Sequence, residues 1–580
     1  MDGVDGDSTR GKLLSRLVVG LSSLVLGVLL LMEGYELIAQ PTLVTLTLIG
    51  VSLVVVLSVV NDVIEVRRLG DVRKARRLLP QTLLLIPILL IAPDTAIWGL
   101  CVFLRQGIVV SMAVSRTSRF RRYMDQLQAK PAKVLVLSFL LVIALGALLL
   151  TFPRATTDGT GARPIDAIFT STSATCVTGL ATLNTVQDEH ADQERQTFTR
   201  FGQFIILILI QIGGLGIMTL SAATVMIAGR KLAMKSRALM QSILDEQSAQ
   251  ALRKTMRDIF LMTFVIEGIG AVVLSLRFWQ LEMDLGEAVW LGTFHSISAF
   301  CNAGFSLFGD SLASFQDDWI VNLTHMVLIC LGGLGFAVVT ALTASRTWGD
   351  GFAVGWGRLA LQIRLVVIVT LMLIVSGSIL YFYLEYDHSL AGLDVGEKLL
   401  ASLFQSVSFR TAGFNSVDMG EMSRAMLIIA CVFMFIGASP GSTGGGIKTS
   451  TVAVLFMSIR ASITGRSDVE LGKHTVNPKV VTRAISIVAI AFFWLILGWV
   501  LLVMTQPDLP FDALLFEAVS ALGTVGLSLG VTPELDGIGK TIVVFLMFVG
   551  RLGPLTIALA VGERQATRGF RYSEERIIVG

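Results

Sequence analysis

Long apolar segments alternate with short polar ones along the whole chain. A helix needs about 20 apolar residues to cross a bilayer, and Leu14–Ile38 and Leu43–Ile64 both reach that length. Residues 79–115 are almost entirely apolar but too long for one span, and Pro93-Asp94 divides them. We therefore expect residues 1–130 to form an N-terminal extension with about four transmembrane helices.

From residue 131 a longer pattern repeats four times: a long apolar segment, a short helix that ends in a glycine turn, and a second apolar segment. It predicts an all-α membrane protein with four pseudo-repeated helix–pore loop–helix units around one central pore, preceded by the extra N-terminal transmembrane helices. The expected units cover residues 131–240, 241–350, 351–470 and 471–580. Their helices are expected at Val134–Phe152, Pro164–Ala174, Gln203–Ala228, Phe260–Leu281, Gly286–Ala299, Val321–Thr343, Leu361–Tyr383, Val395–Ser408, Met426–Ile459, Ile485–Met504, Phe511–Leu522 and Ile542–Val561.

Each short helix ends in a turn that closes on one glycine. The four stretches are Thr170–Gly179, Phe294–Gly304, Gln405–Gly413 and Ala518–Gly526. Non-helical backbone at membrane depth is tolerated only where protein buries it or where it lines a wet cavity. Four such turns therefore indicate four walls of one pore.

The turns have the chemistry of a monovalent cation filter. Glycine permits the dihedral angles at which backbone carbonyls face an ion, and the C-terminal ends of the short helices favour a cation. The absence of a ring of carboxylates argues against a divalent-cation filter. A helix cap is the alternative for any single turn, but four in register favour the pore. The candidate ion-binding residues are Thr175, Cys176, Val177, Thr178, Gly179, Cys301, Asn302, Ala303, Gly304, Arg410, Thr411, Ala412, Gly413, Gly523, Thr524, Val525 and Gly526.

Composition supports a membrane protein without enzymatic chemistry. Of 580 residues, 53% are hydrophobic and 15% charged, whereas soluble domains carry roughly 25% charged residues. The five cysteines form no metal-binding pattern, and no acid–base or nucleophile motif is present, so no enzyme and no bound organic cofactor are expected. Gly441–Gly446 is glycine-rich but lacks the spacing of a phosphate-binding loop.

Basic residues cluster between the apolar segments, at 67–77, 116–130, 230–237 and 460–479. The positive-inside rule places these clusters in the cytoplasm. Both chain termini are then cytoplasmic, and the four glycine turns open to the outside of the cell.

The second long segment of the third unit contains a candidate gate. Four glycines follow Pro440 within Gly437–Gly446, a density that an unbroken helix does not tolerate. Arg551 lies inside an apolar run, where an arginine is costly and usually faces an interior or a wet cavity. It either satisfies the carbonyls of the helix break or forms a positive barrier in the conduction path. The candidate gate residues are Gly437, Ser442, Thr443, Gly444, Gly445, Gly446 and Arg551.

Other polar residues near the turns have structural interpretations. We expect Arg410 to point behind the filter and brace the pore helices with an acidic residue such as Glu517. Asn302 either contributes to the filter or braces it. Lys448 is expected to snorkel to the cytoplasmic membrane surface. Asp166 and Asp512 suit the helix starts near which they stand. The repeated motif at 213–216 and 332–335, G-G-L-G, predicts close helix packing.

The motifs together resemble the Trk/Ktr/HKT superfamily of potassium transporters. The matching stretches include A-T-C-V-T-G-L, Q-I-G-G-L-G-I-M-T-L, S-A-F-C-N-A-G-F, F-R-T-A-G-F-N, G-S-T-G-G-G-I-K-T, G-R-L-G-P-L-T and Y-S-E-E-R-I-I-V-G. The resemblance covers about residues 131–580 and is nearest to the bacterial Ktr membrane subunit, whereas the extra N-terminal spans resemble the Trk subgroup, which typically adds two.

The resemblance implies a potassium uptake protein of the bacterial plasma membrane. Gly179, Gly304, Gly413 and Gly526 are then the filter glycines, and glycine in all four turns is associated with preference for potassium. Gly437–Gly446 is the intramembrane loop beneath the filter. The implied partners are a second copy of the chain and a cytoplasmic nucleotide-binding (RCK-type) regulatory ring. A secondary transporter of another monovalent cation, sodium or ammonium, is the alternative.

Overall fold

The computed structural model describes residues 131–185, 197–228, 249–344, 352–466, 468–471 and 474–553. The four helices expected within residues 1–130 lie outside the described residues, as do the basic link at 230–237 and the tail after residue 553.

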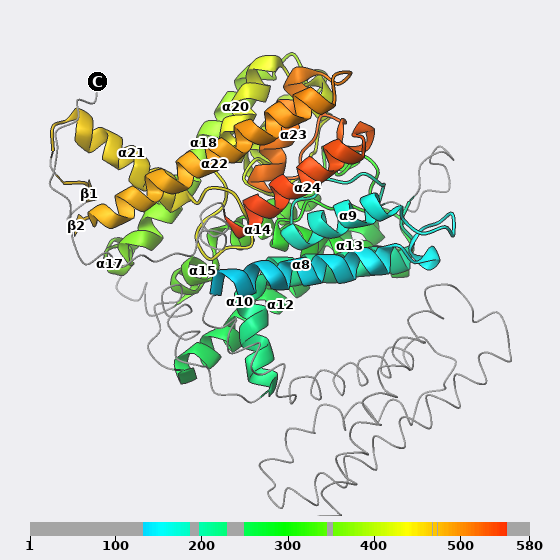
Figure 1. Cartoon of the computed structure of the whole chain (residues 1–580), viewed down its shortest axis with the longest axis horizontal. Coiled ribbons are helices and arrows are strands. Elements are labelled where there is room, and N and C mark those ends of the chain that lie inside the picture. Colours follow the sequence, from blue (N-terminus) through cyan, green and yellow to red (C-terminus); the bar gives the residue numbers. More distant parts are fainter. Residues whose placement is uncertain are drawn as a thin grey trace, which may run out of the picture.

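The described chain is helical apart from a two-stranded ribbon, β1 (Glu470–Leu471) and β2 (His474–Thr475) (Figure 1). Its helices follow the expected order of long helix, short helix and second long helix. They are α8 (Pro131–Leu150), α9 (Pro164–Cys176), α10 (Arg200–Ala228), α12 (Ala249–Gln280), α13 (Leu285–Cys301), α14 (Trp319–Leu334), α15 (Phe336–Thr343), α17 (Phe352–Arg358), α18 (Leu361–Leu384), α19 (Val395–Ser408), α20 (Arg424–Phe435), α21 (Thr449–Ile463), α22 (Pro478–Thr505), α23 (Phe511–Gly523) and α24 (Gly537–Leu552).

Within the described residues, three helices are long and apolar enough to cross a membrane. They are the Met256–Gln280 part of α12, α18 and α22, and the bent pair of α14 and α15 forms a fourth candidate if it is one span. These helices expose large apolar side chains, such as Phe264, Met372 and Phe493, which are 57%, 65% and 59% exposed. That exposure is the pattern of helices that face lipid.

The four short helices α9, α13, α19 and α23 form the interior of the molecule. Their C-terminal halves are almost fully buried, including hydroxyl side chains such as Ser173, Ser298 and Ser520. In the first three units a serine of the short helix donates a hydrogen bond to a backbone carbonyl of the preceding long helix. A glycine one turn further on leaves room for that serine. The bonds are Ser171 to Ile143, Ser296 to Glu267 and Ser406 to Ile374, each 2.7 Å, and the glycines are Gly146, Gly270 and Gly377.

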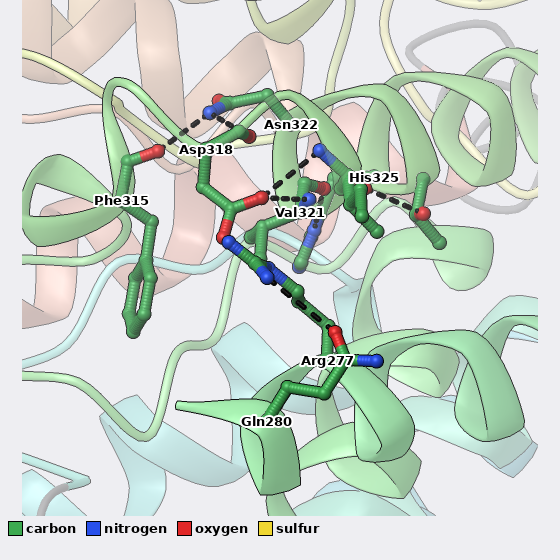
Figure 2. Close-up of polar contacts among 9 residues, drawn as sticks. Arg277, Gln280, Phe315, Asp318, Val321, Asn322 and His325 are labelled. Carbon is green, nitrogen blue, oxygen red and sulfur yellow. Dashed lines mark hydrogen bonds and ion pairs between the residues drawn. The ribbon is translucent and has the colours of Figure 1, made fainter. Parts of the chain in front are cut away.

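A polar contact joins the end of each long helix to the start of the second helix in units two, three and four. In unit two, Arg277 Nε donates to Asp318 Oδ2 at 2.7 Å, while Asp318 Oδ1 accepts from two backbone amides of α14 (Figure 2). Unit three uses Glu385, which accepts from the Ser423 hydroxyl at 2.5 Å, and unit four uses Gln506 and Asp536. These contacts fix the two long helices of a unit around its short helix.

The second long helices of units one and two break at a glycine, and that of unit four ends before one, which the sequence did not predict. Gly216, Gly335 and Gly553 each have φ between 71° and 89°, a region that only glycine adopts at little cost. In unit two the break bends the chain by 107° between α14 and α15, in place of the expected continuous helix Val321–Thr343. Each glycine is the last of a G-x-L-G motif, so the motif that predicted packing also ends the helix.

Candidate functional site

The glycines of the four turns meet at one place. A side chain on Gly179 would collide with the carbonyl oxygen of Ala303, and one on Gly304 with that of Ala412. In the same way, a side chain on Gly413 would collide with the carbonyl oxygen of Val525, and one on Gly526 with that of Thr178, so the four contacts form a closed circle. The carbonyl before each glycine thus faces the glycine of another turn, and all four glycines have φ between 69° and 100°.

A residue with unusual backbone geometry precedes each glycine by two positions. Val177, Asn302, Thr411 and Thr524 have φ between 51° and 69°, although none is glycine and three are β-branched, for which a positive φ is an outlier. Such strain concentrates at functional sites. The sequence pointed to the glycines but gave no sign of these four left-handed residues.

Serine hydroxyls hold the turns in shape. Ser173 Oγ accepts a hydrogen bond from the Gly179 backbone amide, and Ser520 Oγ accepts one from the Gly526 amide, both at 3.0 Å. In the other two turns the serine donates instead: Ser298 Oγ donates to the Phe305 carbonyl at 2.7 Å, and Ser408 donates to that of Phe414. Buried serine side chains thereby fix the shape of all four turns.

A cavity of about 240 Å³ lies directly against the glycines. Gly179, Gly304, Gly413 and Gly526 all line it, together with residues that follow them in each turn. The described residues that line it carry no charged side chain; they contribute backbone, apolar groups, hydroxyls and the amides of Asn184 and Asn415.

The glycine-rich loop Gly437–Gly446 contacts the left-handed residues. Gly444 lies against the Thr411 hydroxyl and Gly445 against that of Thr524, with no room for a β-carbon at either glycine. Thr443 Oγ1 lies 3.1 Å from both the Phe300 carbonyl and the Asn302 side chain. None of these loop residues lines the cavity. The loop thus meets the turns at the end away from the cavity.

Two basic side chains hold this loop. The Arg551 guanidinium donates from Nη1 to the Thr443 carbonyl and from Nη2 to the Gly213 carbonyl of α10. Lys448 Nζ donates to the Gly444 carbonyl at 2.7 Å and to that of Gly445 at 3.2 Å. The expectation that Lys448 snorkels to the membrane surface is therefore wrong. Loop carbonyls without helical partners attract its ammonium group. Ser442 donates within the loop, to the Ser439 carbonyl at 2.6 Å.

Arg410 does not pair with Glu517, contrary to the suggested brace. Within the described residues no ion pair joins them, and Glu517 accepts instead from the Thr532 hydroxyl at 2.5 Å. Arg410 is 2% exposed and lies beside Gly333 of α14. Cys301, at the same position relative to its glycine, lies beside Gly214 of α10. Both side chains pack against a second helix.

The G-x-L-G motifs carry the packing expected of them. A β-carbon on Gly213, Gly332 or Gly550 would collide with the carbonyl of Thr175, Phe300 or Leu522, near the end of a short helix. Arg551 stands in its motif where Gly214 and Gly333 stand in theirs. The arginine in place of glycine at this position brings a guanidinium to the contact between α24 and the loop Gly437–Gly446.

The acids near the helix starts behave differently from one another. Asp166, in the first turn of α9, pairs with Lys540 of α24 at 2.7 Å, and the two side chains are 6% and 14% exposed. Asp512, in the first turn of α23, lies 3.8 Å from the exposed Arg424 and accepts from the Ala513 amide. The sequence suggested a helix-dipole role for both acids but did not identify the Lys540 partner.

A family model described as "TrkH: Cation transport protein" matches residues 102–566. The chain belongs to this family. The TrkH family consists of cation transport proteins, which agrees with the expectation that the chain is not an enzyme.

Individual members of the TrkH family support the assignment. Ktr system potassium uptake protein B of Vibrio alginolyticus is 38% identical over 79% of this chain and 96% of its own length. Potassium/sodium uptake protein NtpJ of Enterococcus hirae is 35% identical over 78% of this chain and 97% of its own. The crystal structure of the potassium transporter TrkH from Vibrio parahaemolyticus superposes with a TM-score of 0.60 at 18% identity, covering 84% of this chain and 97% of that one. It shares the helical membrane fold.

Proposed function

We propose that this protein takes up potassium across the plasma membrane through a filter made by its four glycine turns. The observation that carries the proposal is the closed circle in which the carbonyl before each glycine faces the glycine of another turn. Carbonyls arranged in this way replace the hydration shell of a bare cation. The cavity beside the circle, whose described lining carries no charged side chain, is the entry from outside.

The filter consists of the residues that precede and include each glycine. Its glycines are Gly179, Gly304, Gly413 and Gly526, and glycine in all four turns favours potassium over sodium. The name of the Vibrio alginolyticus relative, a potassium uptake protein, supports potassium as the ion. Membrane potential drives entry, at about 2.3 kcal/mol per charge for every 100 mV.

The gate is the loop Gly437–Gly446 together with Arg551. The loop covers the inner ends of at least three turns, through Thr443, Gly444 and Gly445. Arg551 fastens it to α10 and places a positive charge at the inner end of the conduction path. A cytoplasmic nucleotide-binding ring, docked on the basic links, moves the loop, and two copies of the chain form the working dimer.

Ion selectivity in proteoliposomes tests the filter. Gly179→Ser and Gly304→Asp change the filter backbone or its charge, and both are expected to lower the ratio of potassium to sodium flux. Gly268→Ala is the control, because Gly268 is an exposed helical glycine with no neighbour within 4 Å of an added β-carbon. Unchanged flux ratios in both filter variants would refute the assignment.

A transporter of sodium is the second candidate, and the description of NtpJ as a potassium/sodium uptake protein favours keeping it. Competition separates the two. If potassium is the preferred ion, a tenfold excess of potassium strongly reduces rubidium uptake, whereas the same excess of sodium changes it little. The reverse order of competition would assign the pore to sodium.

A further inference from the structure

Glu267 is a buried carboxyl group next to the proposed filter, and none of the described side chains pairs with it as a cation. Glu267 stands near the middle of the apolar stretch Met256–Gln280 of α12 and is 4% exposed. A charge at this depth is costly and usually marks a function. None of the ion pairs among the described residues includes Glu267.

The groups around Glu267 are donors. Gln211 Nε2 of α10 lies 3.2 Å from both carboxyl oxygens, and the Cys301 thiol donates to Oε1 at 3.7 Å. A carboxylate only accepts hydrogen bonds, whereas a protonated acid must also donate one. With the Gln211 amide placed as it is, both contacts suit the ionised form. With its oxygen and nitrogen exchanged, Gln211 Oε1, which has no partner among the described residues, would accept from a protonated acid. Glu267→Gln separates the two forms, because a neutral acid predicts no change in ion affinity.

Glu267 is fixed to the second filter turn through both its backbone and its side chain. Ser296 of α13 donates to the Glu267 carbonyl at 2.7 Å, and Cys301 belongs to the last turn of α13, three residues before Gly304. The carboxylate thus lies directly behind the filter backbone. Protein of low dielectric separates it from the ion path, so its field is poorly screened.

Arg551 is held by the same short segment of α10. Its Nη2 donates to the Gly213 carbonyl, two residues after Gln211. The segment from Gln211 to Gly213 therefore contacts both charged groups: the Gln211 side chain contacts the Glu267 carboxylate, and the Gly213 carbonyl accepts from the Arg551 guanidinium. A positive charge this close to the filter repels the cation that has to pass, and a negative charge offsets it.

We propose that the Glu267 carboxylate is an electrostatic element of the filter, which raises cation occupancy and offsets the field of Arg551. The residue does not touch the ion, since Cys301 lies between them, and acts through its charge. This inference rests on the proposed position of the filter, but it does not depend on which monovalent cation is carried.

Glu267→Gln tests it, because glutamine keeps the shape and removes the charge. Uptake is measured in proteoliposomes over a range of rubidium and, separately, sodium concentrations. For the ion that is carried, the half-saturation concentration is expected to rise about tenfold, as for a unit charge about 10 Å away at an effective dielectric of about 20. Glu267→Asp keeps the charge and is expected to restore most of the affinity.

Glu385→Gln is the matched control. Glu385 is equally buried, but it ends α18 and accepts hydrogen bonds from Ser389 and Ser423, away from the filter turns. Its variant is expected to lose thermal stability without a change in half-saturation. An unchanged half-saturation in Glu267→Gln, or an equal rise in Glu385→Gln, would overturn the proposal.

A binding measurement distinguishes this inference from the proposed function. Potassium and sodium chloride are titrated against the melting temperature of the purified protein, since an ion that binds the folded state raises it. If Glu267→Gln needs a higher salt concentration than the wild type for half of the rise in melting temperature, with either ion, the result supports the role of the carboxylate. Stabilisation of the wild type by sodium alone contradicts the potassium assignment and leaves the test of Glu267 valid.

Discussion

Single residues decide how the loop and the glycine turns are held. Arg551 bonds the carbonyls of Thr443 and Gly213, so it both fastens the loop and carries a charge. The two roles make opposite predictions. A charge barrier that is removed increases conduction, whereas a lost brace lets the loop and the adjoining turns deform.

We predict that Arg551→Gln increases basal rubidium flux several-fold, because glutamine retains hydrogen bonding and removes the positive barrier. The measurement is uptake by proteoliposomes without any regulatory partner. Lys448→Gln is the comparison, since Lys448 also bonds the loop, through the Gly444 and Gly445 carbonyls. Lower flux in Arg551→Gln, with an unchanged melting temperature, would instead favour the bracing role.

The contact between the loop and the left-handed residues gives a second prediction at this scale. Gly445 leaves no room for a β-carbon beside the Thr524 hydroxyl. Gly445→Ala is therefore expected to push the loop away from the turn and raise basal flux. Gly441 has open space around an added β-carbon, but its φ of 74° makes alanine strained there. Gly441→Ala is therefore a control that strains the loop backbone without a collision against a neighbouring residue. An equal rise in flux in both variants would contradict a role for the contact between Gly445 and Thr524.

At the scale of elements, the glycine pattern predicted where helices pack but not where they end. A β-carbon on Gly213 would collide with the Thr175 carbonyl at the end of α9. We predict that Gly213→Ala lowers stability by about 1–3 kcal/mol, the range for overpacking a tight contact. Gly268→Ala is the control, expected to be neutral or to stabilise by up to about 1 kcal/mol. Chemical unfolding in detergent measures both, and equal values would show that the packing at Gly213 is not tight.

Much of the element order followed from the sequence because membrane length and glycine turns are local signals. The short helix Val395–Ser408 has the expected bounds, and the turn glycines have the positive φ that motivated their selection. The bend at Gly335 was missed because a glycine in an apolar run fits both a packed helix and a broken one. The partners of Lys448 and Asp166 depend on segments that meet only in the folded protein.

At the scale of the whole molecule, the first and last described units close the circle. The Gly526 turn faces the Thr178 carbonyl, and the ion pair between Asp166 and Lys540 joins the same two units. The pair links residues 374 positions apart in the chain. It lies at the start of α9, whose other end carries the first filter turn. This contact joins the first and fourth units, so it requires both to be folded.

We predict that Lys540→Met lowers stability by about 3–5 kcal/mol, because it leaves the buried Asp166 carboxylate without its partner. Adding Asp166→Leu to that variant removes the unpaired charge and is expected to recover a large part of the loss. The measurement is the free energy of unfolding of both variants, with rubidium uptake as the functional readout. If the pair also sets the filter geometry, the double variant regains stability but not the wild-type ratio of potassium to sodium flux. Recovery of both would make the pair a purely structural link between the first and last units.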